Sequence, residues 1–200
     1  MLSLTPRERK AQKTKLFLEE GLLQLMKEKN IKNITVRELT ERVNINRSTF
    51  YLHYLDIFDM VEKIEQKLID AFYQELERDK AERTTEEEVY HFMEQAVLFL
   101  QKNRRTFLIL CSENGDHSFF DRLVELVYRH AIVWICSILG EHSDARRTEH
   151  AAAFFCNGCV AMLASWLQSD EDMNSMELLK MMFQLVLRGA EGFLADHQSG

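Results

Sequence analysis

The amino-acid sequence predicts an all-α protein of about nine helices, with a small N-terminal three-helix part and a larger C-terminal helical bundle. Only one Pro and seven Gly occur in 200 residues, and the helix-favouring residues Leu, Met, Glu and Lys are abundant. Apolar residues recur at spacings of three and four through most of the chain, the period of a helix with one buried side. A chain of this length can bury a substantial core.

The first helix is predicted from Thr5-Pro6-Arg7-Glu8 to about Lys29. Thr5 is its N-cap, Pro6 takes the first helical position, and Glu8 completes a capping box. Apolar residues form one stripe on its second half (Leu18, Leu22, Leu25 and Met26).

Two short helices and a tight turn are predicted for ITVRELTERVNINRSTFYLHY, from Ile34 to Tyr54. Thr35 and Glu38 are spaced as a capping box for a helix over residues 36–43. Asn44 follows, a residue that tolerates the left-handed conformation in which helices end.

The second short helix is predicted from Arg47 to Tyr54, with Asn46 as its N-cap and Phe50 facing inward. Its other side is too polar and too aromatic for ordinary core. A short helix, a turn and a second short helix make up the helix-turn-helix pattern, in which the second helix enters the major groove of DNA.

Candidate DNA contacts follow from that placement. Arg47 and Ser48 open the recognition helix, where Arg47 can pair with guanine or equally contact a phosphate. Leu52 can meet a thymine methyl group, whereas Tyr51 and His53 favour phosphates. The predicted DNA-binding residues are Lys13, Thr35, Arg37, Asn46, Arg47, Ser48, Thr49, Tyr51, Leu52, His53 and Tyr54.

Thr49-Phe50-Tyr51-Leu52-His53-Tyr54 is similar to the T-[FL]-Y-x-H-[FY] run in the recognition helix of the TetR family of transcriptional regulators. Thr35-Val36-Arg37-Glu38-Leu39 matches that family's first short helix. The resemblance implies a DNA-binding domain over residues 1–55, a linking helix over about 56–79, and a C-terminal effector-binding and dimerisation domain over 80–200. It also implies that His53 lies at the DNA backbone.

Three residues depart from the family pattern. Asn30 and Asn44 stand where the family usually has Gly, which is tolerable because Asn also reaches positive φ. Ile57 stands where a phosphate-contacting Lys is common, so one family contact is predicted to be missing.

Charge is distributed unevenly along the chain. Residues 1–55 hold 11 Lys and Arg against 6 Glu, a net of +5, so the remainder holds 14 against 26, a net of −12. The cations include a cluster on the first helix (Arg9, Lys10, Lys13 and Lys15). Any single Lys there is more often solvated, but as a group beside a helix-turn-helix they favour phosphate contacts. The sequence thus predicts a basic reading head on an acidic body.

The rest of the chain is predicted to be helical over about 56–79, 85–103, 104–111, 118–140, 144–168 and 175–195. Asp56 is the expected N-cap of the first of these helices, and the polar stretch 78–84 is the only plausible boundary. The buried face of the helix over 85–103 is expected to include Phe92, Ala96, Phe99 and Leu100.

The final two helices are apolar around most of their circumference and are predicted to be buried on more than one face. The resemblance implies that they form a homodimer, which would place two recognition helices about 34 Å apart on a palindrome. It also implies an effector, a small molecule or a protein. Candidate pocket residues, each more often core, are Phe107, Cys111, Trp134, Phe155, Asn157 and Trp166.

Other classes of site and protein receive little support. Cys156-x-x-Cys159 lies in an apolar helix without a second ligand pair, so buried small hydrophobes are favoured over zinc or a redox switch. No metal and no cofactor are predicted. The sequence has no G-x-S-x-G, Walker loop or H-E-x-x-H motif, which argues against an enzyme. Four Cys without a signal peptide indicate the cytoplasm, and no apolar run is expected to approach the roughly 18 residues of a membrane span.

Together these observations predict a cytoplasmic, homodimeric transcriptional regulator, a repressor that binds double-stranded DNA and is released by an effector. The alternative is a helical protein-interaction or co-regulator module with weak or lost DNA binding, which Ile57 would fit. Salt-dependent binding to duplex DNA separates the two.

Overall fold

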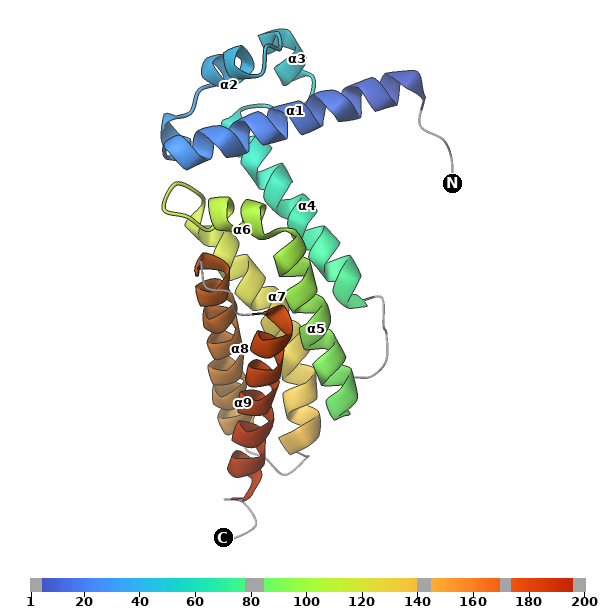
Figure 1. The fold of residues 1–200 in the computed structure, drawn as a ribbon, viewed down its shortest axis with the longest axis vertical. Helices are drawn as coiled ribbons and strands as arrows, with labels where there is room; N and C mark the ends of the chain where they lie inside the picture. The colour runs from blue at the N-terminus through green and yellow to red at the C-terminus, as the bar shows by residue number, and fades with distance from the viewer. Residues whose placement is uncertain (1–4, 78–84, 140–144, 170–173, 196–200) are drawn as a thin grey trace. The chain divides into compact units, whose positions relative to one another are not determined.

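The computed structural model describes residues 5–77, 85–139, 145–169 and 174–195, which form nine α-helices and one short 3-10 helix (Figure 1). In chain order these are α1 (Pro6–Glu28), η1 (Ile31–Asn33), α2 (Val36–Arg42), α3 (Arg47–Tyr51), α4 (Ile57–Glu77), α5 (Glu86–Lys102), α6 (Arg104–Leu110), α7 (His117–Leu139), α8 (Ala145–Gln168) and α9 (Ser175–Ala195). The all-α fold class predicted from the sequence is confirmed for these residues.

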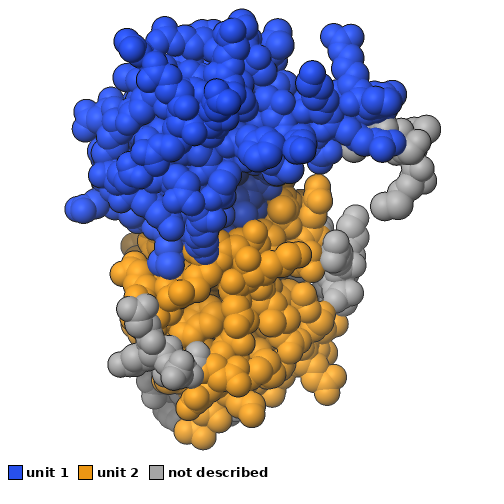
Figure 2. All heavy atoms as spheres, turned by 45° about the horizontal axis from the view of Figure 1, so that its top comes forward, with its two compact units in different colours: residues 1–69, 105–119 blue, residues 70–104, 120–200 orange. Residues whose placement is uncertain are grey.

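The chain divides into two compact units, which are coloured separately in Figure 2. The first consists of residues 1–69 together with 105–119, and the second of residues 70–104 and 120–200. The inclusion of 105–119 in the first unit was not expected. Arg105 donates two hydrogen bonds to the Glu20 carboxylate, at 2.6 and 3.2 Å, and the Ile31 amide donates to the Asn114 carbonyl at 3.0 Å. Arg105 and Glu20 are 85 residues apart, beyond the reach of local sequence patterns.

The start of α1 is the predicted capping box. Thr5 Oγ1 accepts a hydrogen bond from the Glu8 amide at 3.3 Å, and the Glu8 carboxylate accepts one from the Thr5 amide at 2.7 Å. The predicted stripe is fully buried from Leu18 to Met26. Residues 5–17 are exposed or half-buried, so the first half of α1 presents its basic side chains to solvent.

The start of α4 and the face of α5 follow the predicted pattern with one difference. Asp56 Oδ1 accepts a hydrogen bond from the Asp59 amide at 2.8 Å, which confirms Asp56 as the cap. On α5 the buried side chains are Val89, Met93, Ala96, Val97 and Leu100. Phe92 and Phe99, expected on that face, are only half-buried because the helix turns Met93 and Val97 inward instead.

The core of the second unit lies between α5, α8 and α9. Tyr90 on α5 packs edge-on against Phe183 on α9, with ring centroids 5.2 Å apart. Arg104 donates to the carbonyl oxygens of Leu167 and Ser169 at 3.0 and 3.1 Å, which caps the C-terminus of α8.

One stripe of α8 is buried within the chain, and its members repeat every three or four residues (Ala152, Cys156, Val160, Leu163 and Leu167). The opposite side, which the sequence predicted to be buried as well, is exposed. It carries no charged side chain between residues 154 and 168 (Phe154, Asn157, Gly158, Ala161, Ser165 and Gln168).

The same composition affects the expectation about membrane spans. Residues 149–168 of α8 reach a mean hydropathy of 1.4, so by length and composition alone this helix is apolar enough to cross a membrane. The expectation that no stretch approaches a span is therefore wrong on composition. This is weak evidence for a membrane, since helices that pack against other helices pass the same test.

Candidate nucleic-acid interface

The turn between α2 and α3 is closed by the residue predicted to close it. Asn44 has a φ of 52°, the left-handed conformation, and it is the one non-glycine residue with positive φ among the described residues. The Ile45 amide then donates to the Thr40 carbonyl at 2.9 Å. Thr40 itself is buried, and its hydroxyl donates to the Val36 carbonyl at 2.8 Å. Local hydrogen bonds thus fix the angle between the two short helices.

Asn30, the other residue at a usual glycine position, does not use positive φ. Its φ is −60°, so the left-handed conformation expected to make this substitution tolerable is absent. Asn30 instead accepts a hydrogen bond from the Lys32 amide at 3.1 Å and donates to the Glu113 carbonyl at 2.9 Å. The side chain therefore joins the α1–α2 junction to the loop after α6.

At the start of α2, half of the predicted capping box is present. Thr35 Oγ1 accepts from the Glu38 amide at 3.2 Å. The Glu38 carboxylate binds the Lys29 ammonium group at 2.5 Å, because α1 ends beside it. Thr35 and Arg37, both predicted DNA contacts, are exposed, and Arg37 forms an ion pair with Glu41 at 2.7 Å.

The recognition helix is shorter than predicted, since α3 ends at Tyr51 and not at Tyr54. Asn46 caps its start and accepts a hydrogen bond from the Ser48 amide at 3.0 Å. The amides of His53 and Tyr54 both donate to the Phe50 carbonyl, at 2.9 and 3.1 Å, so the chain turns tightly after α3. Five helical residues followed by this turn carry most of the side chains predicted to contact DNA.

The exposed side of α3 gathers four of the eleven predicted DNA-binding residues. Arg47 and Ser48 are exposed, Tyr51 is 58% exposed and Leu52 is 79% exposed. Spacings of three and four place these four side chains on one side of the helix. Phe50 is fully buried on the other side, as predicted. The helix thus has a core anchor and an outward face of mixed chemistry.

Tyr54 is placed differently from the prediction. Its side chain is 4% exposed, its ring lies 5.6 Å from that of Phe50, and its hydroxyl donates to the Glu19 carboxylate at 3.4 Å. Burial raises the pKa of this phenol. We therefore assign Tyr54 to the core of the first unit and not to the exposed side that was predicted to contact DNA.

His53 is half-buried and lies close to the basic side of α1. Burial, and then the positive charge of Lys15, lower the pKa of the imidazole. His53 is therefore neutral at physiological pH in the free protein. The effect of Lys15 also shows that the cations of α1 act near the end of the recognition helix.

Ion pairing separates the cations of the first unit into two groups. Lys29, Arg37 and Arg42 are each held by a glutamate, at N–O distances of 2.5 to 2.7 Å. The exposed side chains of Arg7, Lys10, Lys15 and Arg47 form no ion pair with any described residue. Lys13 lies over the Phe17 ring, 5.7 Å from its centroid, and its ammonium group stays exposed. Most of the positive charge available to a phosphate thus lies on the first half of α1 and the start of α3, while Lys27 and Lys32 are exposed at the end of α1 and on η1.

The predicted effector-pocket residues do not gather in one described pocket. Phe107 and Cys111 belong to the first unit, where the ring of Phe107 stacks on that of Phe119 with the centroids 5.9 Å apart. Phe155, Asn157 and Trp166 lie on α8 in the second unit. Trp134 is on α7, but its side chain lies outside the described residues. A pocket formed by all six stays a prediction.

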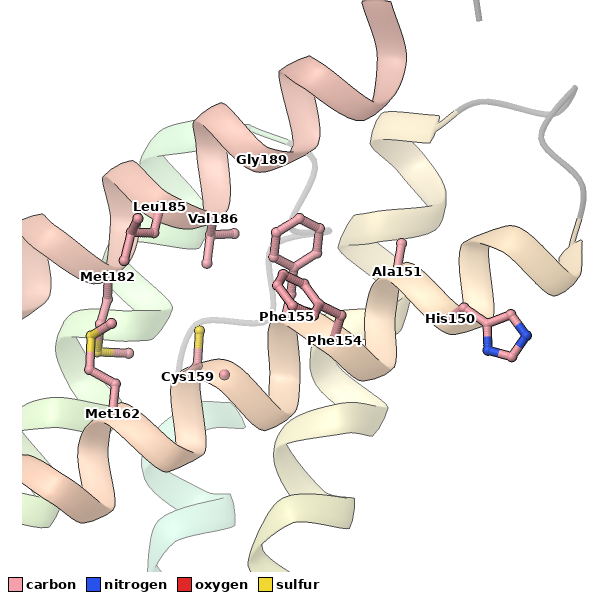
Figure 3. A pocket seen from close by; sticks show the side chains of 11 residues that line it. His150, Ala151, Phe154, Phe155, Cys159, Met162, Met182, Leu185, Val186 and Gly189 are labelled. Atoms are coloured by element: carbon pink, nitrogen blue, oxygen red, sulfur yellow. The ribbon is translucent and has the colours of Figure 1, made fainter. Parts of the chain in front are cut away.

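An open apolar groove of about 650 Å³ lies between α8 and α9 (Figure 3). Phe155 is the one member of the predicted pocket set that lines it. Figure 3 shows Phe154 and Phe155 on α8, with Met182, Leu185 and Val186 extending from α9. The lining residues are His150, Ala151, Phe154, Phe155, Gly158, Cys159, Met162, Met182, Leu185, Val186 and Gly189. Sequence reasoning missed Phe154, although Phe154, Gly158 and Met162 follow one another at spacings of four along one side of the helix.

Two cysteines of α8, Cys156 and Cys159, carry protonated thiols. Burial raises the pKa of Cys156 to about 12 and that of Cys159 to about 11, so neither is a nucleophile at neutral pH. No group of three or more His, Cys, Asp or Glu within the described ranges could hold a metal ion. Cys156 and Cys159 therefore have the environment of small apolar residues packed in a helix.

Comparison with known proteins identifies similar chains. A family model described as a transcriptional regulator C-terminal region of TetR type matches residues 87–188. The helix-turn-helix-type transcriptional regulator YxbF of Bacillus subtilis (strain 168), itself uncharacterised, is 28% identical over 111 residues. That alignment covers 52% of this chain and 28% of YxbF, so it spans under a third of the relative's length.

Two solved structures share the fold. A TetR transcriptional regulator from Streptococcus agalactiae 2603V is 20% identical with a TM-score of 0.62, and the alignment covers 90% of this chain and 97% of that one. The dihydroxyacetone kinase operon activator DhaS is 13% identical with a TM-score of 0.53, covering 89% of this chain and 96% of that one. At these identities the likeness concerns the fold alone.

Proposed function

This chain belongs to the TetR family of transcriptional regulators, and we propose that it is a repressor that binds a palindromic operator as a homodimer and is released by an effector. The observation that carries the proposal is the outward side of α3. Arg47, Ser48, Tyr51 and Leu52 are exposed there, beside cations on α1 that no described carboxylate neutralises. A surface with this combination suits a polyanion that also presents base edges.

In the proposed complex α3 lies in the major groove. Arg47 and Ser48 are at its N-terminus, where recognition helices meet bases, and Leu52 reaches a thymine methyl group. Tyr51 and His53 bind phosphates, together with Lys13 and its neighbours on α1. Asn46 and Thr35 hold the starts of α3 and α2, and Arg37 and Thr49 contribute from the flanks of the motif.

The proposed dimer uses the exposed sides of α8 and α9. Phe154 is 74% exposed and Leu185 is 57% exposed, and both line the apolar groove. Contiguous exposed apolar surface of this kind marks an interaction site. In a two-fold dimer the same patch meets itself, so Phe154 of each copy can enter the groove of the other.

Gly158 supports the same arrangement. A Cβ built at this position meets nothing within 4 Å, so packing within the chain does not require glycine there. Glycine inside a helix is unfavourable by about 1 kcal/mol relative to alanine. Close approach of a second copy supplies a physical reason for it.

Release by an effector is the part of the proposal that rests most on the family. An effector must bind the conformation that does not fit the operator better than the one that does, or it shifts nothing. The groove and the residues around Phe155 are the described surface on which such differential binding can be sought.

The test is fluorescence anisotropy of the full chain on DNA flanking its own gene, across a series of salt concentrations. We expect saturable binding as a dimer, a preference for one palindrome over competitor DNA, and affinity that falls steeply with salt. Weak, sequence-independent binding would remove the operator from the proposal. Absence of binding at low salt would favour the alternative.

That alternative is a helical protein-interaction or co-regulator module. The observation that favours it is Ile57, which is buried at the position where the family commonly places a phosphate-binding Lys. A module of this kind would keep the α8–α9 dimer and lose salt-dependent DNA binding, so the same experiment separates the two functions.

A further inference from the structure

The corner between α3 and α4, which comprises residues 52–59, is built differently from the rest of the proposed DNA surface. The first amides of a helix commonly bind a phosphate, because they point outward and carry the positive end of the helix dipole. Here one carboxylate of the protein takes a first-turn amide of α4, and a second carboxylate takes a backbone amide just before the helix. Asp56 Oδ1 accepts from the Asp59 amide, and Asp59 Oδ2 accepts from the Leu55 amide, both at 2.8 Å.

The corner also lacks an outward cation. Ile57 is 4% exposed, so its side chain belongs to the core and a Lys could not replace it without cost. Lys63, one turn after Asp59, is committed to the Asp59 carboxylate at 2.8 Å. That contact lowers the pKa of Asp59, so the carboxylate stays charged. A negatively charged, self-capped helix start does not attract a phosphate.

Exposed apolar side chains lie where a phosphate-binding cation would otherwise be expected. Leu52 is the C-cap of α3, and Leu55, three residues later, is 78% exposed. Phe58 in the first turn of α4 is exposed as well. Leu55 does not pack as the usual apolar staple over the helix start, because Met60 at the partner position is fully buried and Leu55 is not. These side chains are therefore free to meet another surface.

Their position makes DNA the occupant. Three residues span at most about 11 Å, and the major groove is about 12 Å wide, so Leu55 lies within reach of the groove that holds α3. The corner follows α3 directly along the chain, and Tyr51 and Leu52 are exposed at the end of that helix. In the major groove the apolar group available to a leucine is the thymine C5-methyl.

We propose that the α3–α4 corner reads thymine methyl groups at the edge of each half-site through Leu52 and Leu55, and that the start of α4 provides no phosphate anchor. The proposal rests on the function proposed above, because it assumes that α3 enters the major groove. Affinity from phosphates then comes from the cations of α1 together with Tyr51 and His53, and Leu52 and Leu55 contribute sequence preference.

The first test places a cation at the corner. Leu55→Lys should fold normally, since residue 55 is exposed and the Asp59 carboxylate bonds its backbone amide and not its side chain. On a duplex selected in vitro with the wild-type dimer, the variant should bind more tightly at low salt. The slope of the logarithm of affinity against the logarithm of salt concentration should steepen by about 0.9 per subunit, or about two per dimer. Leu98→Lys, on an exposed leucine of α5, adds the same charge in the second unit and should leave the slope unchanged.

The second test removes the methyl groups from the DNA. Replacing thymine by uracil at the edge of the half-site should weaken wild-type binding about three- to four-fold per base, the size expected for losing one buried methyl group. Leu55→Ala should be insensitive to the same replacement. Leu98→Ala should respond as the wild type does.

The outcomes are distinguishable. If the wild type shows no saturable, sequence-preferring binding, the proposed function fails first. If it binds but Leu55→Lys leaves the slope unchanged, the corner does not lie along DNA, and a protein partner becomes its occupant. If the slope steepens but uracil has no effect, the corner follows the backbone and the methyl readout is overturned.

Discussion

The outward side of α3 and the outward side of α8 are both exposed in the described chain, but they are made of different residues. The α3 side combines a cation, a hydroxyl, a phenol and a leucine, and it lies beside the unpaired cations of α1. The α8 side carries Phe, Asn, Gly, Ala, Ser and Gln without a charge. Exposure alone therefore does not identify a partner. Charge favours DNA for the first surface, and its absence together with the groove favours a second copy for the other.

A second difference concerns support from the core. The five residues of α3 are held by local caps and by one anchor, Phe50, which is fully buried. The 24 residues of α8 are held by a long buried stripe. Substitutions on the outside of α3 should thus alter binding without unfolding the protein, and those on α8 should separate dimerisation from folding.

The largest expected effect is on α3. Tyr51→Ala combined with His53→Ala should reduce operator affinity by at least about 30-fold, up to complete loss, because two proposed contacts with DNA phosphates disappear together. Circular dichroism and sedimentation should show a folded dimer. Tyr73→Ala, which removes an exposed tyrosine from α4, is the control. Retained operator binding in the double variant would remove α3 as the recognition helix.

On α8, Phe154→Glu should weaken the dimer by at least about 30-fold, because a carboxylate would be buried without a partner in an apolar interface. Analytical ultracentrifugation over a concentration series measures this, and operator affinity should fall with it. Leu98→Glu, with the same charge on an exposed leucine, should leave the dimer intact. An unchanged dimer in the Phe154 variant would contradict the α8–α9 interface.

Ion pairing sharpens the comparison within the first unit. Lys10→Gln should reduce the slope of log affinity against log salt concentration by about one per subunit, since this exposed cation is available to a phosphate. Arg42→Gln removes an equal charge, but one that Glu28 binds through two hydrogen bonds of 2.7 and 2.8 Å, and should change the slope less. Equal changes in the two variants would mean that net charge alone matters.

A pair of glycines distinguishes packing within one chain from packing between copies. In a monomeric Phe154→Glu background, Gly158→Ala should raise the free energy of unfolding by about 0.5–1 kcal/mol, because the added methyl meets open space. Gly189→Ala should lower it, since its Cβ would lie 2.7 Å from Phe155 Cε1. Urea unfolding measures both. In the dimer, by contrast, Gly158→Leu should weaken association.

The smallest expected effect is a pH dependence at His53. Its pKa is lowered in the free protein, so the stability gained from the neutral imidazole is present above about pH 6.5 and is lost as pH falls through the lowered value. A nearby phosphate favours the charged form, so operator affinity should rise as pH falls from 7.5 to 6, by about two- to three-fold. Anisotropy at fixed ionic strength tests this, and His53→Gln should abolish the dependence.

Much of the local structure could be predicted from the sequence. Thr5 with Glu8, Asn46 before α3, Asp56 before α4 and the left-handed Asn44 are each observed as expected. The helix-turn-helix motif and the outward placement of Arg47, Ser48, Tyr51 and Leu52 follow from the same patterns. All of these features depend on hydrogen bonds and spacings within about four residues.

Predictions that required distant partners were less complete. Tyr54 has the same aromatic character as Tyr51, and the sequence did not distinguish them. Glu19, 35 residues away, and Phe50 enclose Tyr54 in the core. Glu38 was expected to complete a cap at Thr35, but Lys29 of α1 takes its carboxylate.

The sequence by itself determined the fold class, the positions of the helices and the chemistry of the exposed side of α3, because each is specified by residues that are neighbours along the chain. Tertiary structure alone decided that residues 105–119 join the first unit, that Ile57 is core, and that the outward side of α8 stays uncovered in one chain. Burial depends on which distant segments pack together, and a helical pattern shows that a face is apolar without showing what covers it.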